Sequence, residues 1–159
     1  MQFYEVEKSY IDYLRQFDKN VLIEKQTTTR KYIGVLFEIG SLKYVAPLSS
    51  PKAKYEHMRN QYDVFLLKNG ELGVINFNLM IPVKQSVIRA VDFSKVADEQ
   101  YRRLLQKQYV EVKKNKEVIM EKAQKMYQLS KKTKLSDYER KVLKRTVNFE
   151  KLEVMQKYH

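Results

Sequence analysis

The 159-residue sequence contains no cysteine, which excludes disulfide bonds, thiolate zinc sites and cysteine nucleophiles. Glycine and proline are scarce, with four and three residues, so we expect no flexible linker and one domain over residues 1–159. No apolar run approaches the roughly 20 residues that a transmembrane helix needs. The first segment, MQFYEVEKSY, has early acidic residues and no apolar core, unlike a signal peptide. These absences predict a cytoplasmic protein that does not enter a membrane.

Histidine is also rare, because only His57 and His159 are present. A ribonuclease mechanism built on two histidines and a zinc site are therefore not expected. The sequence has neither the G-x-x-x-x-G-K-[ST] nor the G-x-G-x-x-G pattern of nucleotide-binding loops. It also lacks a close acidic cluster of the kind that holds magnesium for two-metal cleavage, so we expect no metal and no other cofactor.

Positive charge, in contrast, is abundant, with a formal net charge of +12 at pH 7. Residues 1–100 contain 14 Lys and Arg against 12 Asp and Glu, whereas residues 101–159 contain 17 against 7. A positive field attracts polyanions, and 12 Tyr and 7 Phe are available to stack on bases, so this composition favours nucleic-acid binding. A solvated lysine-rich helical face and an anionic membrane surface are the alternatives.

Runs of β-branched and aromatic residues separated by short turns predict an antiparallel sheet in the first half of the chain. The predicted strands are residues 3–6, 32–39, 42–48, both arms of a hairpin over 62–77, and 78–83. Gly40-Ser41 and Asn69-Gly70 supply the turns of two hairpins, and Pro82 indicates an edge strand or a bulge. Residues 20–31 are expected to be an irregular, mobile segment.

Helical periodicity is found near residues 9–18, where Ser9 is the expected cap, and again after about residue 95. One apolar face of the later helices is formed by Tyr101, Leu104, Leu105, Tyr109 and Val112, and another by Ile119, Ala123 and Met126. Ser136 and Glu139 form a capping box, and Asn148 is expected to open a last short helix. Strands followed by helices predict an α+β fold.

The stretch YVAPLSSPK, residues 44–52, is a strand that runs into two hydroxyls, a proline and a lysine. RNA supplies its own nucleophile, the 2′-hydroxyl, so an RNA-cleaving enzyme needs alignment, positive charge and hydrogen-bond donors around the phosphate. Ser49, Ser50 and Lys52 have suitable side chains, and Arg30 or Lys31 would be supplied by the neighbouring strand. The same composition is also that of an ordinary turn, so this motif alone leaves both interpretations open.

Four stretches together resemble the ToxN/AbiQ family, the endoribonuclease toxins of type III toxin–antitoxin systems. They are MQFYEVEKSYIDYL, RKYIGVLFEIGSLKYVAPLSSPK, GVINFNLMIPV and YRRLLQKQYVEV, at residues 1–14, 30–52, 73–83 and 101–112. The order and spacing are similar over residues 1 to about 120. The most specific part is a strand, a glycine and a second strand, followed by Pro-Leu-Ser-Ser-Pro-Lys.

The resemblance implies an α+β fold with a strongly twisted antiparallel sheet, a partial barrel with packed helices, similar to MazF/Kid-type toxins. It implies metal-independent cleavage of adenine-rich single-stranded RNA, leaving a 2′,3′-cyclic phosphate and a 5′-hydroxyl. The implied inhibitor is a small pseudoknot RNA transcribed from repeats, which closes with the toxin into a ring-like assembly. Cellular and phage RNA would be the substrates, and phage abortive infection or plasmid maintenance the role.

The resemblance also assigns residues. Catalysis falls on Ser49, Ser50, Lys52 and Arg30, with Ser50 the most needed and Lys31 able to exchange with Arg30. The tyrosine that some relatives carry before Lys-Gln in the long helix is Gln106 here, which leaves Tyr109 as the alternative. The residues expected to bind RNA are Tyr10, Lys31, Lys54, Tyr55, Lys107, Gln108, Lys113 and Lys114.

Other interpretations remain open. Tyr10 is equally compatible with a buried helix residue whose hydroxyl finds a core partner. The charge and the aromatic residues alone are compatible with a non-catalytic RNA-binding module. The segment KKTKLSDYERKVLKRTV, residues 131–147, is compatible with a helical protein that docks on an acidic surface.

Overall fold

The longest hairpin joins β2 (Tyr32–Ile39) to β3 (Leu42–Ser49) in the computed structural model, which describes residues 1–22, 31–59 and 61–159. Their antiparallel register runs from Gly34 opposite Pro47 to Ile39 opposite Leu42. Gly40 has a φ of +62°, a left-handed conformation that glycine adopts without strain. The hairpin predicted around Gly40-Ser41 is therefore confirmed, whereas most of the predicted irregular segment lies outside the described residues.

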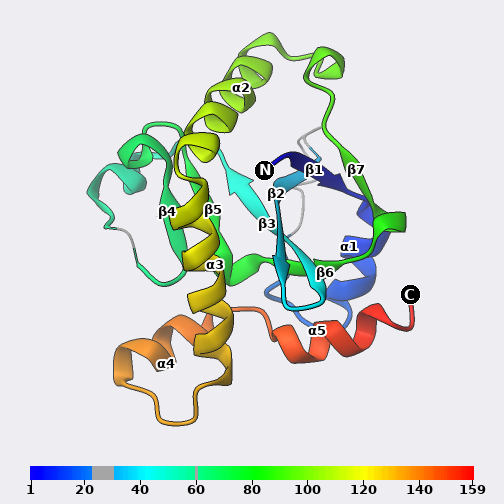
Figure 1. Ribbon diagram of the computed structural model, residues 1–159, viewed down its shortest axis with the longest axis vertical. Helices are drawn as coiled ribbons and strands as arrows, with labels where there is room; N and C mark the ends of the chain where they lie inside the picture. Colours follow the sequence, from blue (N-terminus) through cyan, green and yellow to red (C-terminus); the bar gives the residue numbers. More distant parts are fainter. Residues whose placement is uncertain (23–30, 60) are drawn as a thin grey trace.

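The sheet is antiparallel and has seven strands in the order β4-β5-β3-β2-β1-β7, with β6 also paired to β3 (Figure 1). The remaining strands are β1 (Phe3–Val6), β4 (Val64–Leu66), β5 (Val74–Asn76), β6 (Ile81–Val83) and β7 (Ile88–Ala90). The path ends at β4 and β7, so the sheet is open in the described part of the chain. The predicted hairpin over 62–77 is confirmed by the pairing of β4 with β5, although its connection is longer than a tight turn.

Strand β3 has two partners on the edge that faces away from β2. Its first half pairs with β6, where Pro82 lies opposite Tyr44, and its end pairs with β5, where Ser49 lies opposite Val74. The last residue of β3, Ser49, is therefore still paired within the sheet where the strand ends. This arrangement positions the segment that follows Ser49.

The α-helices of the described chain are α1 (Lys8–Arg15), α2 (Glu99–Lys114), α3 (Lys116–Lys131), α4 (Asp137–Lys144) and α5 (Phe149–Gln156). In Figure 1, α2 and α3 follow one another along one side of the sheet, and α4 lies beyond the end of α3. Helix α5 packs on β6 and contacts α1. None of the helices in the described ranges is long and apolar enough to cross a bilayer.

Helix starts follow the predicted capping chemistry in two of three cases. Ser136 and Glu139 form the predicted capping box of α4, and the Asn148 side chain accepts a hydrogen bond from the Lys151 N–H of α5. The prediction of Ser9 as the cap of α1 was wrong. That helix begins at Lys8 after Glu7, whose backbone carbonyl accepts hydrogen bonds from Tyr10 and Ile11.

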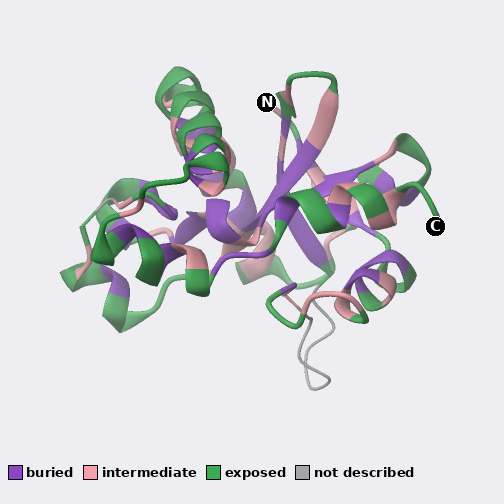
Figure 2. Cartoon of the chain, turned by 90° about the horizontal axis from the view of Figure 1, so that it is seen from below, coloured by how far each residue is buried: buried purple, intermediate pink, exposed green. Residues whose placement is uncertain are grey.

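The core lies between the sheet and the helices, where the buried positions of both meet (Figure 2). Leu105, Val112, Ile119, Ala123 and Met126 are buried, as the helical periodicity predicted. Tyr44 of β3 packs edge-on against both Tyr127 of α3 and Phe149 of α5, and the Tyr44 and Tyr127 hydroxyls both donate hydrogen bonds to Glu153 Oε1. This contact joins the sheet to α3 and α5.

Candidate active site

The two hydroxyls singled out in the sequence lie where β3 leaves the sheet. Ser49 is the last residue of β3, and both Ser49 and Ser50 are half-buried. Pro51 and Lys52, which follow, are exposed. The motif is therefore anchored at one end by strand pairing and open to solvent at the other.

Gly73 lies directly against the backbone of this motif. Its φ is +98°, and a Cβ atom built on it would lie only 1.9 Å from the Ser49 carbonyl oxygen. Such a distance leaves no space for a side chain, so glycine is required both by conformation and by contact. The loop before β5 thus approaches Ser49 and Ser50 as closely as a backbone can.

Two amide side chains hold the Ser49 end of β3. Asn76 Nδ2 donates to Ser49 Oγ at 2.8 Å and to the Pro47 carbonyl at 3.3 Å. The Ser49 hydroxyl accepts this bond and keeps its own hydrogen for donation. Gln108 Nε2 of α2 donates to the Leu72 carbonyl at 2.7 Å and to the Ser49 carbonyl at 3.5 Å.

Gln108 was expected to bind RNA, and in the structure its side chain is buried. Only 1% of its surface is exposed, and its amide group is used inside the protein. The helical periodicity of α2 did not predict a polar residue on its buried face. In the structure, Gln108 therefore holds the backbone on both sides of the site, at Ser49 and Leu72.

Lys52 begins the short 3₁₀ helix Ala53–His57, and its carbonyl accepts a hydrogen bond from the Tyr55 N–H at 2.9 Å. Lys54 is exposed, and its Nζ lies 5.4 Å from the centre of the Tyr55 ring. Tyr55, which was also expected to contact RNA, is 5% exposed and packs with Leu66 and Val74. Tyr55 anchors the loop that carries the two lysines.

Of the two basic residues expected from the neighbouring strand, Lys31 lies directly before β2. The β2–β3 pairing ends at Gly34 opposite Pro47, so Lys31 lies beyond the paired residues of β2. Lys31 is exposed, and its Nζ lies 3.5 Å from Glu5 Oε1, which is also 3.8 Å from Arg89. These three residues line a hollow of about 400 Å³. Arg30, the other basic residue expected here, lies outside the described residues.

Tyr10 was expected in the site on one interpretation and in the core on the other. It is fully buried, and its hydroxyl donates to the Pro82 carbonyl at 2.5 Å. Burial raises the pKa of Tyr10 well above its usual value, so the phenol stays neutral. The prediction that Tyr10 is a buried helix residue whose hydroxyl finds a core partner is confirmed.

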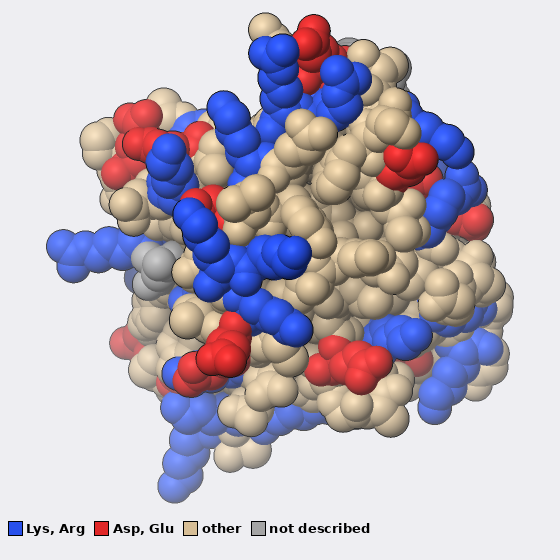
Figure 3. Space-filling model, turned by 45° about the horizontal axis from the view of Figure 1, so that its top comes forward, with Lys and Arg blue, Asp and Glu red and all other residues tan. Residues whose placement is uncertain are grey.

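The lysines predicted on the long helix are exposed. Lys107, Lys113 and Lys114 all lie on α2, with Lys113 Nζ 5.8 Å from the centre of the Tyr109 ring. Tyr109 packs edge-on against Phe3 at 5.5 Å, so it is a packing residue. In Figure 3, which turns the α2 end forward, Lys and Arg side chains gather over part of the face beside a broad uncharged area.

The chemistry present at the end of β3 is that of hydroxyls, amides and cations. Within residues 1–22, 31–59 and 61–159, no group of three or more His, Asp and Glu is arranged to hold a metal ion. Hydrogen-bond donors and positive charge on a rigid strand end are suited to a phosphate whose negative charge increases during reaction. Gly73 and Asn76 were missed by the sequence prediction, because the pairing of β5 with β3 is not visible in one sequence.

Comparisons with known proteins identify relatives of this chain. A family model described as "Toxin ToxN, type III toxin-antitoxin system" matches residues 2–157. The Endoribonuclease ToxN of Pectobacterium atrosepticum is 33% identical over 132 residues, which are 77% of this chain and 77% of that protein.

Two solved structures are similar over almost their whole length. One, described as "A processed non-coding RNA regulates a bacterial antiviral system", has a TM-score of 0.84 and 27% identity, and the match covers 100% of this chain and 99% of that chain. The other is described under "selective toxin inhibition by a non-coding RNA pseudoknot" and has a TM-score of 0.83 and 29% identity, with 99% and 96% covered. Sequence and fold therefore point to the same group of proteins.

Proposed function

The chain belongs to the ToxN family of toxins of type III toxin–antitoxin systems and is an endoribonuclease, and we propose that it cuts adenine-rich single-stranded RNA at the end of β3. The observation that supports this location is the placement of Ser49, Ser50 and Lys52. Strand pairing, Gly73 and Gln108 fix the backbone there, while Lys52 is exposed to solvent.

The proposed reaction is attack of the 2′-hydroxyl oxygen of RNA on the adjacent phosphorus. A bond forms between these atoms, the bond from phosphorus to the 5′-oxygen breaks, and the products are a 2′,3′-cyclic phosphate and a 5′-hydroxyl. The proton lost by the 2′-hydroxyl is balanced by the proton gained by the 5′-oxygen. No metal ion is needed for this balance.

In this proposal the side chains act mainly by alignment and charge. The hydroxyls of Ser49 and Ser50 donate to phosphate oxygens, and Lys52 and Arg30 stabilise the negative charge of the transition state. Lys31, Lys54, Lys107, Lys113 and Lys114 contact phosphates on either side. The buried residues Tyr10, Tyr55 and Gln108 support the site from within.

The proposal extends to the biological partners. We infer that a small pseudoknot RNA inhibits the toxin, because one similar structure is described under toxin inhibition by such an RNA. We further infer a ring-like assembly with that RNA in the cytoplasm, cellular and phage RNA as substrates, and a role in abortive infection or plasmid maintenance. The strongly twisted, partial-barrel geometry of MazF/Kid-type toxins belongs to the same proposal.

Expression of the unsubstituted chain and of Ser50→Ala in bacteria tests this function. We expect the unsubstituted chain to stop growth and Ser50→Ala to permit it at equal protein level. Ser41→Ala, at the exposed turn of the β2–β3 hairpin, is the matched control and should remain toxic. Growth arrest by Ser50→Ala would show that the role given to Ser50 is wrong, and salt-sensitive RNA binding without cleavage would favour a non-catalytic RNA-binding module.

A further inference from the structure

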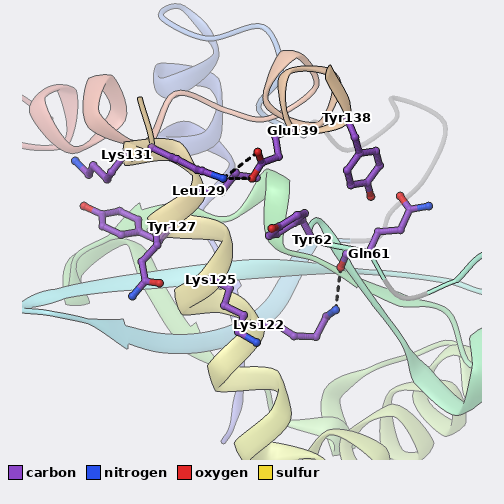
Figure 4. A pocket seen from close by; sticks show the side chains of 11 residues that line it. Gln61, Tyr62, Lys122, Lys125, Tyr127, Leu129, Lys131, Tyr138 and Glu139 are labelled. Carbon is purple, nitrogen blue, oxygen red and sulfur yellow. Dashed lines mark hydrogen bonds and ion pairs between the residues drawn. The ribbon is translucent and has the colours of Figure 1, made fainter. Parts of the chain in front are cut away.

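A second hollow lies apart from Ser49 and Ser50, between α3, α4 and the segment before β4. Its volume is about 1020 Å³, and its lining includes Gln61 and Tyr62, the second half of α3, and Tyr138 and Glu139 of α4 (Figure 4). None of the residues assigned to catalysis or RNA contact above lines it. Its lining includes several tyrosine and lysine side chains.

Two of the chain's exposed tyrosines lie together in this hollow. Tyr62 is 38% exposed and Tyr138 is 43% exposed, and their ring centres are 6.3 Å apart with planes tilted by 35°. Exposed aromatic rings placed side by side offer stacking surfaces for planar bases, and such stacking does not depend on base identity. Burial, followed by the nearby Asp63 carboxylate, raises the pKa of Tyr138, so its hydroxyl stays protonated and able to donate.

The hollow is also positively charged. Four lysines line it, namely Lys122, Lys125, Lys131 and Lys132. The carboxylate in the lining, Glu139, is occupied by Lys132, whose Nζ lies 3.0 and 2.9 Å from its two oxygens, and by the Ser136 N–H.

The lysines differ in their present contacts. Lys122 Nζ donates to the Gln61 carbonyl at 2.8 Å, and burial, followed by the nearby charge of Lys125, lowers the pKa of Lys122. Lys131 Nζ lies 5.2 Å from the centre of the Tyr127 ring at the rim. Lys125 pairs with Glu121 at 3.1 Å in an exposed i to i+4 pair, which is weak and easily exchanged for a phosphate.

We propose that this hollow binds an unpaired nucleotide of single-stranded RNA, with the base on Tyr62 and Tyr138 and the phosphate near Lys125 and Lys131. Single-stranded RNA is the ligand class because its bases are free to stack on protein rings, whereas the bases of a duplex are already stacked on each other. The site is separate from the proposed cleavage site and holds RNA whether or not the chain cuts it.

The test is a titration of the full chain with a fluorescein-labelled, adenine-rich 2′-O-methyl RNA, which lacks the nucleophile and stays intact. Tyr62→Ala/Tyr138→Ala is compared with Tyr62→Phe/Tyr138→Phe, which keeps both rings, and with Tyr158→Ala, which removes a tyrosine that is 74% exposed elsewhere. We expect the alanine pair to weaken binding of the single strand at least tenfold. The phenylalanine pair and Tyr158→Ala should stay within twofold of the unsubstituted chain.

A duplex of the same sequence distinguishes stacking from charge, because its bases are not free to stack on the tyrosines. The affinity of Tyr62→Ala/Tyr138→Ala for this duplex should differ less than twofold from that of the unsubstituted chain. Single-strand affinity equal to that of the unsubstituted chain would overturn the proposal. If the alanine pair has lost its fold by circular dichroism, photocrosslinking of a 4-thiouridine RNA to the unsubstituted chain decides instead. Crosslinks at Tyr62 or Tyr138 support the site, and crosslinks confined to other residues overturn it.

Cleavage of ordinary RNA is measured in parallel. A chain that binds through these tyrosines but never cuts RNA contradicts the proposed function and leaves this site intact. A chain that cuts RNA while the alanine pair binds normally contradicts this site alone.

Discussion

Gly73 lies against the Ser49 carbonyl oxygen, and a Cβ atom built on Gly73 would be only 1.9 Å from that oxygen. The φ of Gly73, +98°, lies in the left-handed region. Gly40 also has a positive φ, at +62°, but a Cβ atom there would meet nothing within 4 Å. The two glycines therefore share one conformational requirement and differ in their contact with the site. Comparing an alanine substitution at each glycine therefore separates an effect on the site from an effect on stability.

We predict that Gly73→Ala lowers the free energy of unfolding by about 3 kcal/mol and cleavage at least tenfold, because the clash adds to the strain of a left-handed alanine. Gly40→Ala should cost about 1–2 kcal/mol and leave cleavage within twofold. Chemical denaturation and a cleavage assay measure the two quantities. Equal cleavage by the two variants would show that the approach of Gly73 to Ser49 does not matter for the site.

Residue types alone did not distinguish surface from interior at three predicted contacts. Tyr10, Tyr55 and Gln108 have side chains suited to RNA, yet all three are buried and make internal contacts. Their environment depends on elements distant in sequence, such as β6 for Tyr10 and the loop before β5 for Gln108. Ser49, Ser50 and Lys52 were placed correctly at a strand end because that placement depends only on local sequence.

At the scale of elements, one carboxylate of α5 adds polar contacts to the apolar packing that holds this helix on the sheet. Glu153 Oε1 accepts hydrogen bonds from the hydroxyls of Tyr44 in β3 and Tyr127 in α3. Burial, followed by the hydrogen bond to Glu153, raises the pKa of Tyr127 to about 12, so its hydroxyl donates throughout the neutral range. Helix periods and caps predicted that α5 exists, but they did not predict this contact, which joins three elements.

We predict that Glu153→Ala lowers the free energy of unfolding by about 3 kcal/mol, because the hydroxyls of the buried Tyr44 and the half-buried Tyr127 lose a charged acceptor. Glu150→Ala, on the exposed side of the same helix, should cost less than about 1 kcal/mol. Urea denaturation of both variants measures the difference. A loss for Glu150→Ala as large as that for Glu153→Ala would mean that helix propensity, rather than this contact, holds α5.

At the scale of the whole molecule, much of the positive charge in the last third of the sequence lies on exposed lysines of α2 and α3. The sheet order could not be predicted, since β3 pairs with β5 and β6, which follow it by more than 20 residues. The α+β class and the neighbouring hairpins were predictable, because strand periods and turns are local.

We predict that replacing Lys107, Lys113 and Lys114 by Gln makes the dependence of log affinity on log salt shallower by about 2 for single-stranded RNA. The physical reason is that each lysine that contacts a phosphate releases condensed counterions. Lys19, Lys68 and Lys157, which are also exposed, give a control triple of the same charge change. Equal slopes for the two triples would mean that net charge alone, and not the α2 lysines, determines RNA affinity.

The most direct test of the central claim is cleavage of a 5′-labelled, adenine-rich single-stranded RNA by purified protein in excess EDTA, beside Ser50→Ala. The account predicts cleavage by the unsubstituted chain, 2′,3′-cyclic phosphate at the new ends, and a loss of at least 100-fold in the variant. Cleavage that requires a divalent metal, or that leaves a 3′-hydroxyl, would contradict a 2′-hydroxyl mechanism at the end of β3.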